Sequence, residues 1–257
     1  MLKFKSLGSG SSGNATLVES TGIFPFRLLV DCGLGFKHLK FRLEEAGLQP
    51  EDIHAIFITH EHGDHIGCAR LLSRRFKIPV WMSAGTYAAI KSPDFEGLLR
   101  TARDGESIDL GGLQITPFTV PHDAREPLQL TCTDGAAKLG ILTDLGHATT
   151  HVLTHLSQCD ALLLEFNHDI ELLAQSNYPA FLKKRVGGLY GHLSNASAIE
   201  MLVQLKHPGL KHVMAAHLSA QNNRPKLVQD LLAEALSCDA DDMTVAQPDK
   251  ASIWLQL

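Results

Sequence analysis

The 257-residue sequence lacks the long apolar run that a membrane-spanning helix needs, because no hydrophobic stretch reaches roughly 18–20 residues. The first residues lead directly into a polar Gly/Ser segment, so we expect no signal-peptide core. The sequence also has no long linker, low-complexity tract or short internal repeat. We therefore expect a cytoplasmic protein with no membrane contact, in which residues 1–257 form one domain.

Cysteine is scarce and shows no pattern of spacing. The chain has no CxxC motif, and its cysteines do not form an even framework of the kind that disulfide-rich proteins use. We expect reduced thiols, most of them small buried apolar residues, at Cys32, Cys68, Cys132, Cys159 and Cys238.

An excess of positive charge is absent as well. The formal net charge is −5, which argues against a protein that grips nucleic acid by its net charge. Two basic clusters stand out nevertheless, at residues 70–75 (Arg70, Arg74 and Arg75) and 183–185 (Lys183, Lys184 and Arg185). Each is interpreted first as a solvated helix face. The second cluster and Arg224 are alternatively candidates for contacting phosphates along a polymer.

Strand-like segments dominate the sequence, with helical patterns between them. Strands are expected at 2–7, 15–20, 27–31, 55–58, 79–83, 161–165, 211–216 and 251–257, with hairpins over 106–120 and 128–144. Helices are expected at 36–46, 68–76, 196–205 and 226–236. Many strands with few βαβ repeats predict the α/β class, as a four-layer αββα sandwich of mostly antiparallel or mixed sheets.

Histidine is abundant, with 14 residues, and several lie in tight motifs with aspartate. The strongest is His60-x-His62-x-Asp64-His65, which follows the apolar strand at 55–58. Extended residues two apart share a face, so the imidazoles of His60 and His62 can point the same way. Gly63 then allows a turn that presents Asp64 and His65. One loop can thus serve two metal ions, and its imidazole and carboxylate groups favour transition metals over Mg or Ca.

Three further residues repeat one pattern, in which a single potential ligand follows an apolar run. They are His122 after residues 118–121, Asp144 after 141–143 and His217 after 213–216. Taken singly, each is as compatible with a capping or hydrogen-bonding role as with ligation. Because strand ends converge on one edge of a sheet, the histidine motif makes metal ligation the better interpretation for all three.

These residues resemble the metallo-β-lactamase superfamily, whose HxHxDH motif is followed by His, Asp and His in that order. The resemblance covers nearly the whole chain and is strongest to the YycJ/WalJ-like branch, which is similar to tRNase Z and phosphodiesterase relatives. The segments that carry it are 8–14 (GSGSSGN), 31–33 (DCG), 122–124 (HDA), 191–195 (GHLSN), 217–219 (HLS) and 222–223 (NN).

The resemblance implies a cofactor of two divalent metal ions, Zn or Mn, with Fe also possible. One ion would be held by His60, His62 and His122 and the other by Asp64, His65 and His217, with Asp144 bridging them. Asp31 would orient a ligand from behind. Asp64 and His192 are the expected catalytic residues, and an exchange of roles between His192 and His217 is the alternative. A further reading of His192 is a helix-entry histidine held by Ser194 or Asn195.

The function implied is that of a hydrolase whose two metals activate a hydroxide, most similar to a phosphodiesterase or DNA exonuclease acting on nucleic acid. An acyl or thioester hydrolase of the glyoxalase II or lactamase type is the alternative. A non-catalytic metal-binding protein would need a missing ligand, and none is missing. No segment resembles the long arm of tRNase Z, and no oligomeric state is predicted. The loop at 9–14 either contacts an anion or forms a tight turn, and His168 either borders the substrate or supports a ligand.

Overall fold

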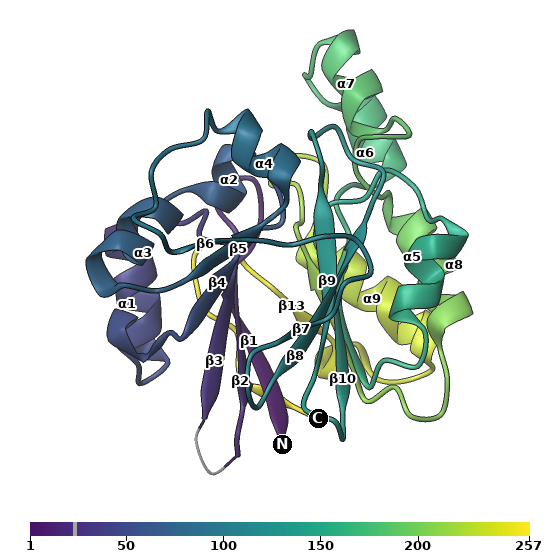
Figure 1. Cartoon of the computed structure of the whole chain (residues 1–257). Coiled ribbons are helices and arrows are strands. Elements are labelled where there is room, and N and C mark those ends of the chain that lie inside the picture. Colours follow the sequence, from purple (N-terminus) through teal and green to yellow (C-terminus); the bar gives the residue numbers. More distant parts are fainter. Residues whose placement is uncertain (23–24) are drawn as a thin grey trace.

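The computed structural model describes residues 1–22 and 25–257. Two seven-stranded sheets face each other, and helices cover their outer surfaces (Figure 1). Each sheet contains both parallel and antiparallel neighbours. The prediction of an αββα sandwich with mixed sheets is therefore confirmed.

The first sheet contains the N-terminal half of the chain and the last strand. Its order is β14-β1-β2-β3-β4-β5-β6. Strands β14 to β3 pair antiparallel and β3 to β6 pair parallel. The strands are β1 (Leu2–Gly8), β2 (Ala15–Ser20), β3 (Phe26–Val30), β4 (Ala55–Phe57), β5 (Val80–Met82), β6 (Leu99–Thr101) and β14 (Leu255–Gln256).

The second sheet contains the middle of the chain, in the order β13-β12-β11-β10-β9-β8-β7. Strands β7 to β10 pair antiparallel, whereas β10 to β13 pair parallel. The strands are β7 (Ile108–Asp109), β8 (Gln114–Thr119), β9 (Leu128–Thr133), β10 (Lys138–Leu142), β11 (Ala161–Glu165), β12 (His212–Ala216) and β13 (Thr244–Val245).

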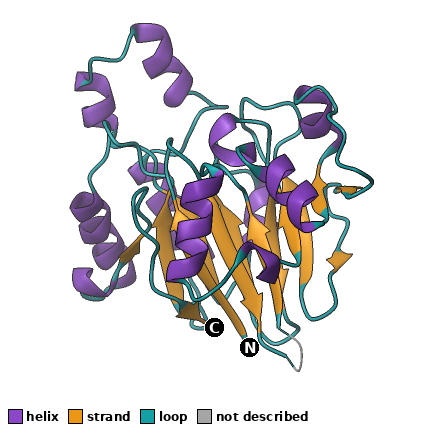
Figure 2. Cartoon of the chain, turned by 90° about the vertical axis from the view of Figure 1, so that its left-hand side faces the viewer, coloured by secondary structure: helices purple, strands orange, loops and turns teal. Residues whose placement is uncertain are grey.

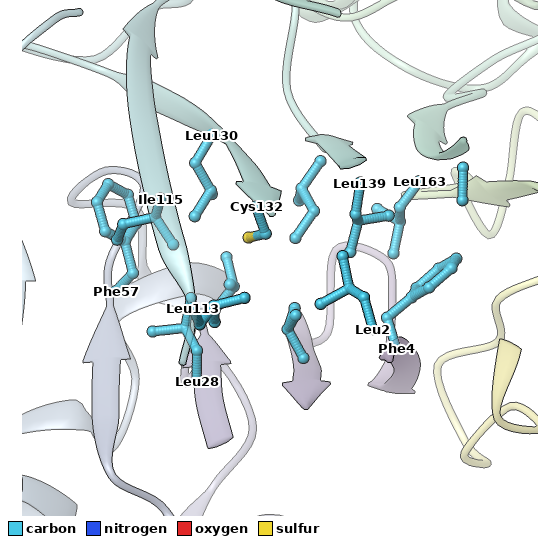
Figure 3. Close-up of a cluster of buried hydrophobic side chains, with 14 of the residues drawn as sticks. Leu2, Phe4, Leu28, Phe57, Leu113, Ile115, Leu130, Cys132, Leu139 and Leu163 are labelled. Atoms are coloured by element: carbon cyan, nitrogen blue, oxygen red, sulfur yellow. The ribbon is translucent and has the colours of Figure 1, made fainter. Parts of the chain in front are cut away.

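The main core lies between the sheets. Phe4 and Phe57 of the first sheet share one cluster with Leu130 and Leu163 of the second (Figure 3). Central strands are also covered by helices on their outer faces, so β4 and β11 are buried along their whole length. Burial on both faces explains why these strands are continuous apolar runs instead of alternating ones.

The helices fall into two layers and one projection. Figure 2 shows the layer over the first sheet, formed by α1 (Phe36–Glu45), α2 (Gly63–Ile66), α3 (Ala69–Phe76) and α4 (Ala84–Ala89). The second sheet is covered by α5 (Thr150–Leu156), α8 (Asn195–Leu205) and α9 (Pro225–Leu236). Helices α6 (Ile170–Gln175) and α7 (Ala180–Val186) project at the end of the sandwich where α2 lies (Figure 1). Short 3-10 turns occupy Pro50–Asp52 and Ala240–Asp242.

Several short elements were not predicted from the sequence. They are α2, α4, α5, α6, α7, β6 and β13, none longer than seven residues. Periodicity is a weak signal over so few residues, and packing against the sheets decides their structure. Among the helices of the described residues, none has the length and apolarity required to span a bilayer.

Candidate metal centre

The histidine motif lies directly after β4, as predicted, but its second half is helical. Residues Gly63–Ile66 form the single turn α2, with His62 at its N-cap position. The turn carries Asp64 and His65 back toward the end of the strand, where His60 is fully buried. One continuous segment therefore supplies four potential ligands from two directions.

The first cluster consists of three histidines whose ring nitrogens converge. His60 Nε2 lies 3.0 Å from His62 Nδ1, which in turn lies 3.4 Å from His122 Nε2. Potential ligand atoms of the three residues all lie within 4.8 Å of one another. His122, predicted from its place after β8, thus joins the histidine motif from the second sheet.

The second cluster combines a carboxylate with two histidines. Asp64 Oδ2 lies 3.6 Å from His65 Nε2 and 3.5 Å from His217 Nε2. His217 follows β12 and adopts a left-handed backbone conformation, with φ 56°. That conformation is uncommon for a residue other than glycine and is found preferentially at functional sites.

Asp144 lies between the two clusters. Its Oδ2 is 3.1 Å from His65 Nε2, and its Oδ1 is 3.6 Å from His122 Nε2. Although Asp144 is only 1% exposed, Oδ2 makes no hydrogen bond of acceptable geometry within the described part of the chain. A buried carboxylate oxygen without a donor is costly unless a cation faces it. Imidazole nitrogens with carboxylate oxygens fit divalent transition-metal ions.

Hydrogen bonds on the outer nitrogens fix how two of the histidines point. His122 Nδ1 lies 3.0 Å from the Gly191 carbonyl oxygen, which can only accept, so Nδ1 carries the hydrogen. His65 Nδ1 lies 2.8 Å from Asp31 Oδ2. Both rings therefore turn an Nε2 lone pair toward the cluster. Asp31 occupies the supporting position predicted for it.

The electrostatics of the centre favour positive charge. Burial alone would lower the pKa of His217, yet the carboxylates of Asp144, Asp64 and Glu165 outweigh it and raise that pKa to about 10. Burial alone would raise the pKa of Asp144, but His217 and His65 hold it well below its ordinary value. The carboxylates thus remain ionised in a buried place and attract cations.

Glu165 is the important residue that the sequence analysis did not assign. It is fully buried at the end of β11, and its Oε1 lies 2.7 Å from His192 Nδ1 and 3.1 Å from His217 Nδ1. Its Oε2 accepts hydrogen bonds from the backbone N–H groups of Leu145 and Leu193. Glu165 ends an apolar strand just as His122, Asp144 and His217 follow theirs, so the same signal was present.

His192 and His217 share Glu165 but differ in what else they face. The His217 side chain is 3% exposed and turns Nε2 to Asp64. The His192 side chain is 20% exposed, and no hydrogen bond joins its Nε2 to another described residue. This geometry favours His217 as the ligand and leaves His192 open to a substrate. His192 is held by Glu165, whereas the Ser194 hydroxyl accepts from the Ser197 N–H, so the helix-entry reading of His192 is wrong.

The loop at residues 9–14 supports the centre from behind. The Asn14 N–H donates to the Asp64 carbonyl oxygen at 2.8 Å, and the Ser9 hydroxyl accepts from the His217 N–H at 2.8 Å. The Ser9, Gly10 and Gly13 N–H groups also have protein acceptors. Of the two predictions for this loop, the tight turn agrees with these contacts. His168 is 3% exposed, which favours a supporting role over contact with a substrate.

Most of the cysteines lie in the interior, outside the centre. Cys32, Cys132 and Cys159 are buried as predicted, Cys68 is half-buried, and Cys238 is exposed.

The two basic clusters lie on helices. Arg74 pairs with Glu96, and Lys77 also contacts Glu96 at 2.8 Å, so the first basic cluster is partly neutralised on the surface of α3. The second basic cluster forms the last turn of α7.

Comparison with known proteins agrees with this geometry. A family model described as a beta-lactamase superfamily domain matches residues 26–217. Over 240 residues the chain is 31% identical to exodeoxyribonuclease WalJ of Streptococcus pneumoniae, covering 91% of this chain and 88% of that protein. It is likewise 31% identical over 240 residues to exodeoxyribonuclease YycJ of Bacillus anthracis, covering 91% of this chain and 89% of that protein.

Solved structures show the same architecture. The metallo-beta-lactamase fold protein YhfI from Bacillus subtilis superimposes with a TM-score of 0.76 at 16% identity, over 100% of both chains. At this identity the likeness concerns the fold alone.

Proposed function

The chain belongs to the metallo-β-lactamase superfamily, and from this we propose that it is a metal-dependent phosphodiesterase that hydrolyses nucleic acid, with DNA as the expected substrate. The proposal is carried by one observation. The complete set of metal-binding side chains lies beside His192, a partly exposed histidine that Glu165 holds at the edge of the two clusters. The exodeoxyribonuclease names of two relatives that span most of the chain support DNA.

In this proposal two divalent metal ions occupy the two clusters. His60, His62 and His122 would hold one and Asp64, His65 and His217 the other, with Asp144 contacting both. When bound, such ions neutralise charge on a phosphate and lower the pKa of water. Zn and Mn fit this donor set, and Fe is also compatible with it.

The role proposed for His192 is proton donation. Burial would lower the pKa of its imidazole, but Glu165 outweighs burial and raises that pKa, which favours the protonated form of the ring. Glu165 accepts the Nδ1 hydrogen at 2.7 Å and thereby leaves Nε2–H for the substrate. A proton donor at that place can assist the leaving oxygen of a phosphodiester. Glu165 is a positioning residue, because it acts through His192.

The test of the proposed function is a cleavage screen with purified protein. End-labelled single- and double-stranded DNA and RNA are incubated with Mn, Zn or Mg, alongside a small phosphodiester reporter and a thioester. Cleavage of DNA that depends on Mn or Zn is expected. Rapid thioester hydrolysis with inert phosphodiesters would instead favour an acyl hydrolase.

We also propose that the protein acts in a reducing compartment such as the cytoplasm. The described residues contain no disulfide, and three of the five thiols are buried. Free buried thiols are typical of proteins in reducing compartments.

A further inference from the structure

Residues 170–190, which follow β11 of the second sheet, expose an unusual share of apolar side chains. Of the nine large hydrophobic residues prominently exposed in the described structure, four lie between residues 170 and 190. They include Phe181 at 74% exposure and Tyr190 at 62%. Helix α7 buries none of its residues and projects beyond the sheets at the end where α2 lies (Figure 1). An exposed apolar surface of this kind indicates a binding site.

The same segment is locally basic on a chain with a net charge of −5. Lys183, Lys184 and Arg185 form the last turn of α7. Arg185 Nε donates to Asp123 Oδ2 at 2.5 Å, yet its side chain remains 56% exposed. Asp123 follows His122 directly, so this ion pair attaches the basic turn to the metal centre.

Backbone contacts hold Tyr190 beside the centre. The Leu189 carbonyl oxygen accepts from His147 Nδ1 at 2.8 Å, and the Gly191 carbonyl oxygen accepts from His122 Nδ1 at 3.0 Å. Gly146 faces the same segment so closely that an added Cβ would lie 2.0 Å from the Leu189 oxygen. Both sequence neighbours of Tyr190 are therefore held by histidines, and one of these, His122, belongs to the first cluster.

We propose that α7 and the Leu189–Tyr190 turn grip a single strand of nucleic acid as it enters the metal centre. Tyr190 and Phe181 stack on bases, while Lys184 and Arg185 contact phosphates. Aromatic rings beside basic side chains are the usual means of binding single strands, because unpaired bases offer their faces for stacking. A second copy of this chain fits less well, since a two-fold contact would bring the basic turns together. This inference rests on the proposed function.

The test measures binding separately from cleavage. The affinity for a labelled single strand of about 12 nucleotides, DNA or RNA, is followed by fluorescence anisotropy in a His192→Ala background. Tyr190→Ala and Phe181→Ala are each expected to weaken binding about tenfold, whereas Tyr190→Phe, which keeps the ring, retains it. Lys184→Ala is expected to reduce the slope of log affinity against log salt by about 0.7.

Helix α1, on the opposite side of the molecule, offers matched controls. Phe41 is 53% exposed there, and Lys37 is exposed on the same helix. Phe41→Ala and Lys37→Ala should leave affinity and salt slope unchanged. If Tyr190→Ala and Phe181→Ala bound the single strand as tightly as the His192→Ala protein alone, the proposed binding of nucleic acid by α7 and the Leu189–Tyr190 turn would be overturned.

Two further outcomes separate this inference from the proposed function. Cleavage of DNA by the wild-type protein with no effect of these substitutions on binding would reject the grip alone. Binding that depends on Tyr190 and Phe181, without cleavage of any nucleic acid, would support the grip and reject the proposed function. If Tyr190→Ala abolished a dimer but left the affinity for the single strand unchanged, the surface would instead join two copies of the chain. This result would also overturn the proposed binding of nucleic acid there.

Discussion

At the scale of single residues, the centre depends on which nitrogen of each histidine is left free. Asp31 contacts the Nδ1 atom of His65, and the Gly191 carbonyl oxygen contacts that of His122. Glu165 contacts the Nδ1 atoms of both His192 and His217. Supporting partners of this kind raise the basicity of a ligand and fix its orientation. They are also the part of the site that sequence patterns reveal least, because they need no fixed spacing from the ligands.

Exchange of the roles of His192 and His217 can be tested by metal content. His192→Ala is expected to keep its bound metal and lose turnover, because Glu165 holds His192 Nδ1 and the side chain remains 20% exposed. His217→Ala should lose metal, because its Nε2 faces Asp64. Metal analysis together with reporter turnover checks both. If His192→Ala lost metal and His217→Ala kept it, the assignment would be reversed.

Glu165→Gln is expected to lower kcat about 10–100-fold with little change in KM. The amide puts an N–H₂ group where Glu165 now accepts hydrogen bonds at both oxygens, so His192 loses its orientation. Glu19→Gln is the matched control. Glu19 is also buried and forms ion pairs with Lys3 and Arg27, but it lies in β2 and belongs to neither of the two clusters. The control should lose stability and keep kcat. Similar kcat values for Glu165→Gln and the wild type would show that Glu165 has no positioning role.

At the scale of elements, three loops interlock behind α2. The Asn14 N–H donates to the Asp64 carbonyl oxygen, the Gly33 N–H to that of Asn14, and the Cys32 N–H to that of His65. The long strands and amphipathic helices were predictable because their apolar patterns are long. The interlocking of these loops was not, since it depends on residues that are far apart in sequence.

Gly33→Ala is expected to disrupt this contact between loops. An added Cβ would lie 1.7 Å from the Asp64 carbonyl oxygen, so the backbone of α2 must shift. We expect lower metal content and a loss of stability of about 1–3 kcal/mol, measured by metal analysis and denaturant unfolding. Gly35→Ala serves as control, because nothing lies within 4 Å of its added Cβ. Normal metal content in Gly33→Ala would contradict the proposed rigidity.

At the scale of the whole molecule, the two sheets meet at the centre. Asp64 and His65 follow β4 of the first sheet, whereas His122, Asp144 and His217 follow strands of the second. The sequence predicted this convergence because ligands repeatedly follow apolar strands. It could not predict α7, because seven residues are too few for a periodic apolar pattern and none of them is buried against a sheet.

Bound metal should therefore stabilise the entire fold. A ligand at 100 times its Kd adds about 2.7 kcal/mol per site to the free energy of unfolding. In a chain of this size that corresponds to a Tm increase of roughly 5–10 °C for one site. Calorimetry of chelator-treated protein before and after addition of Zn or Mn measures it. An unchanged Tm would contradict metal binding between the sheets.

The central claim, a two-metal phosphodiesterase, is tested most directly by titrating chelator-treated protein with Mn or Zn while measuring hydrolysis of a phosphodiester reporter. Activity is predicted to be absent without metal and to reach its maximum at about two equivalents per chain. Asp64→Asn and Asp144→Asn should bind less metal and fall at least about 1000-fold in activity. Full activity without metal, or none at two equivalents, would contradict the claim.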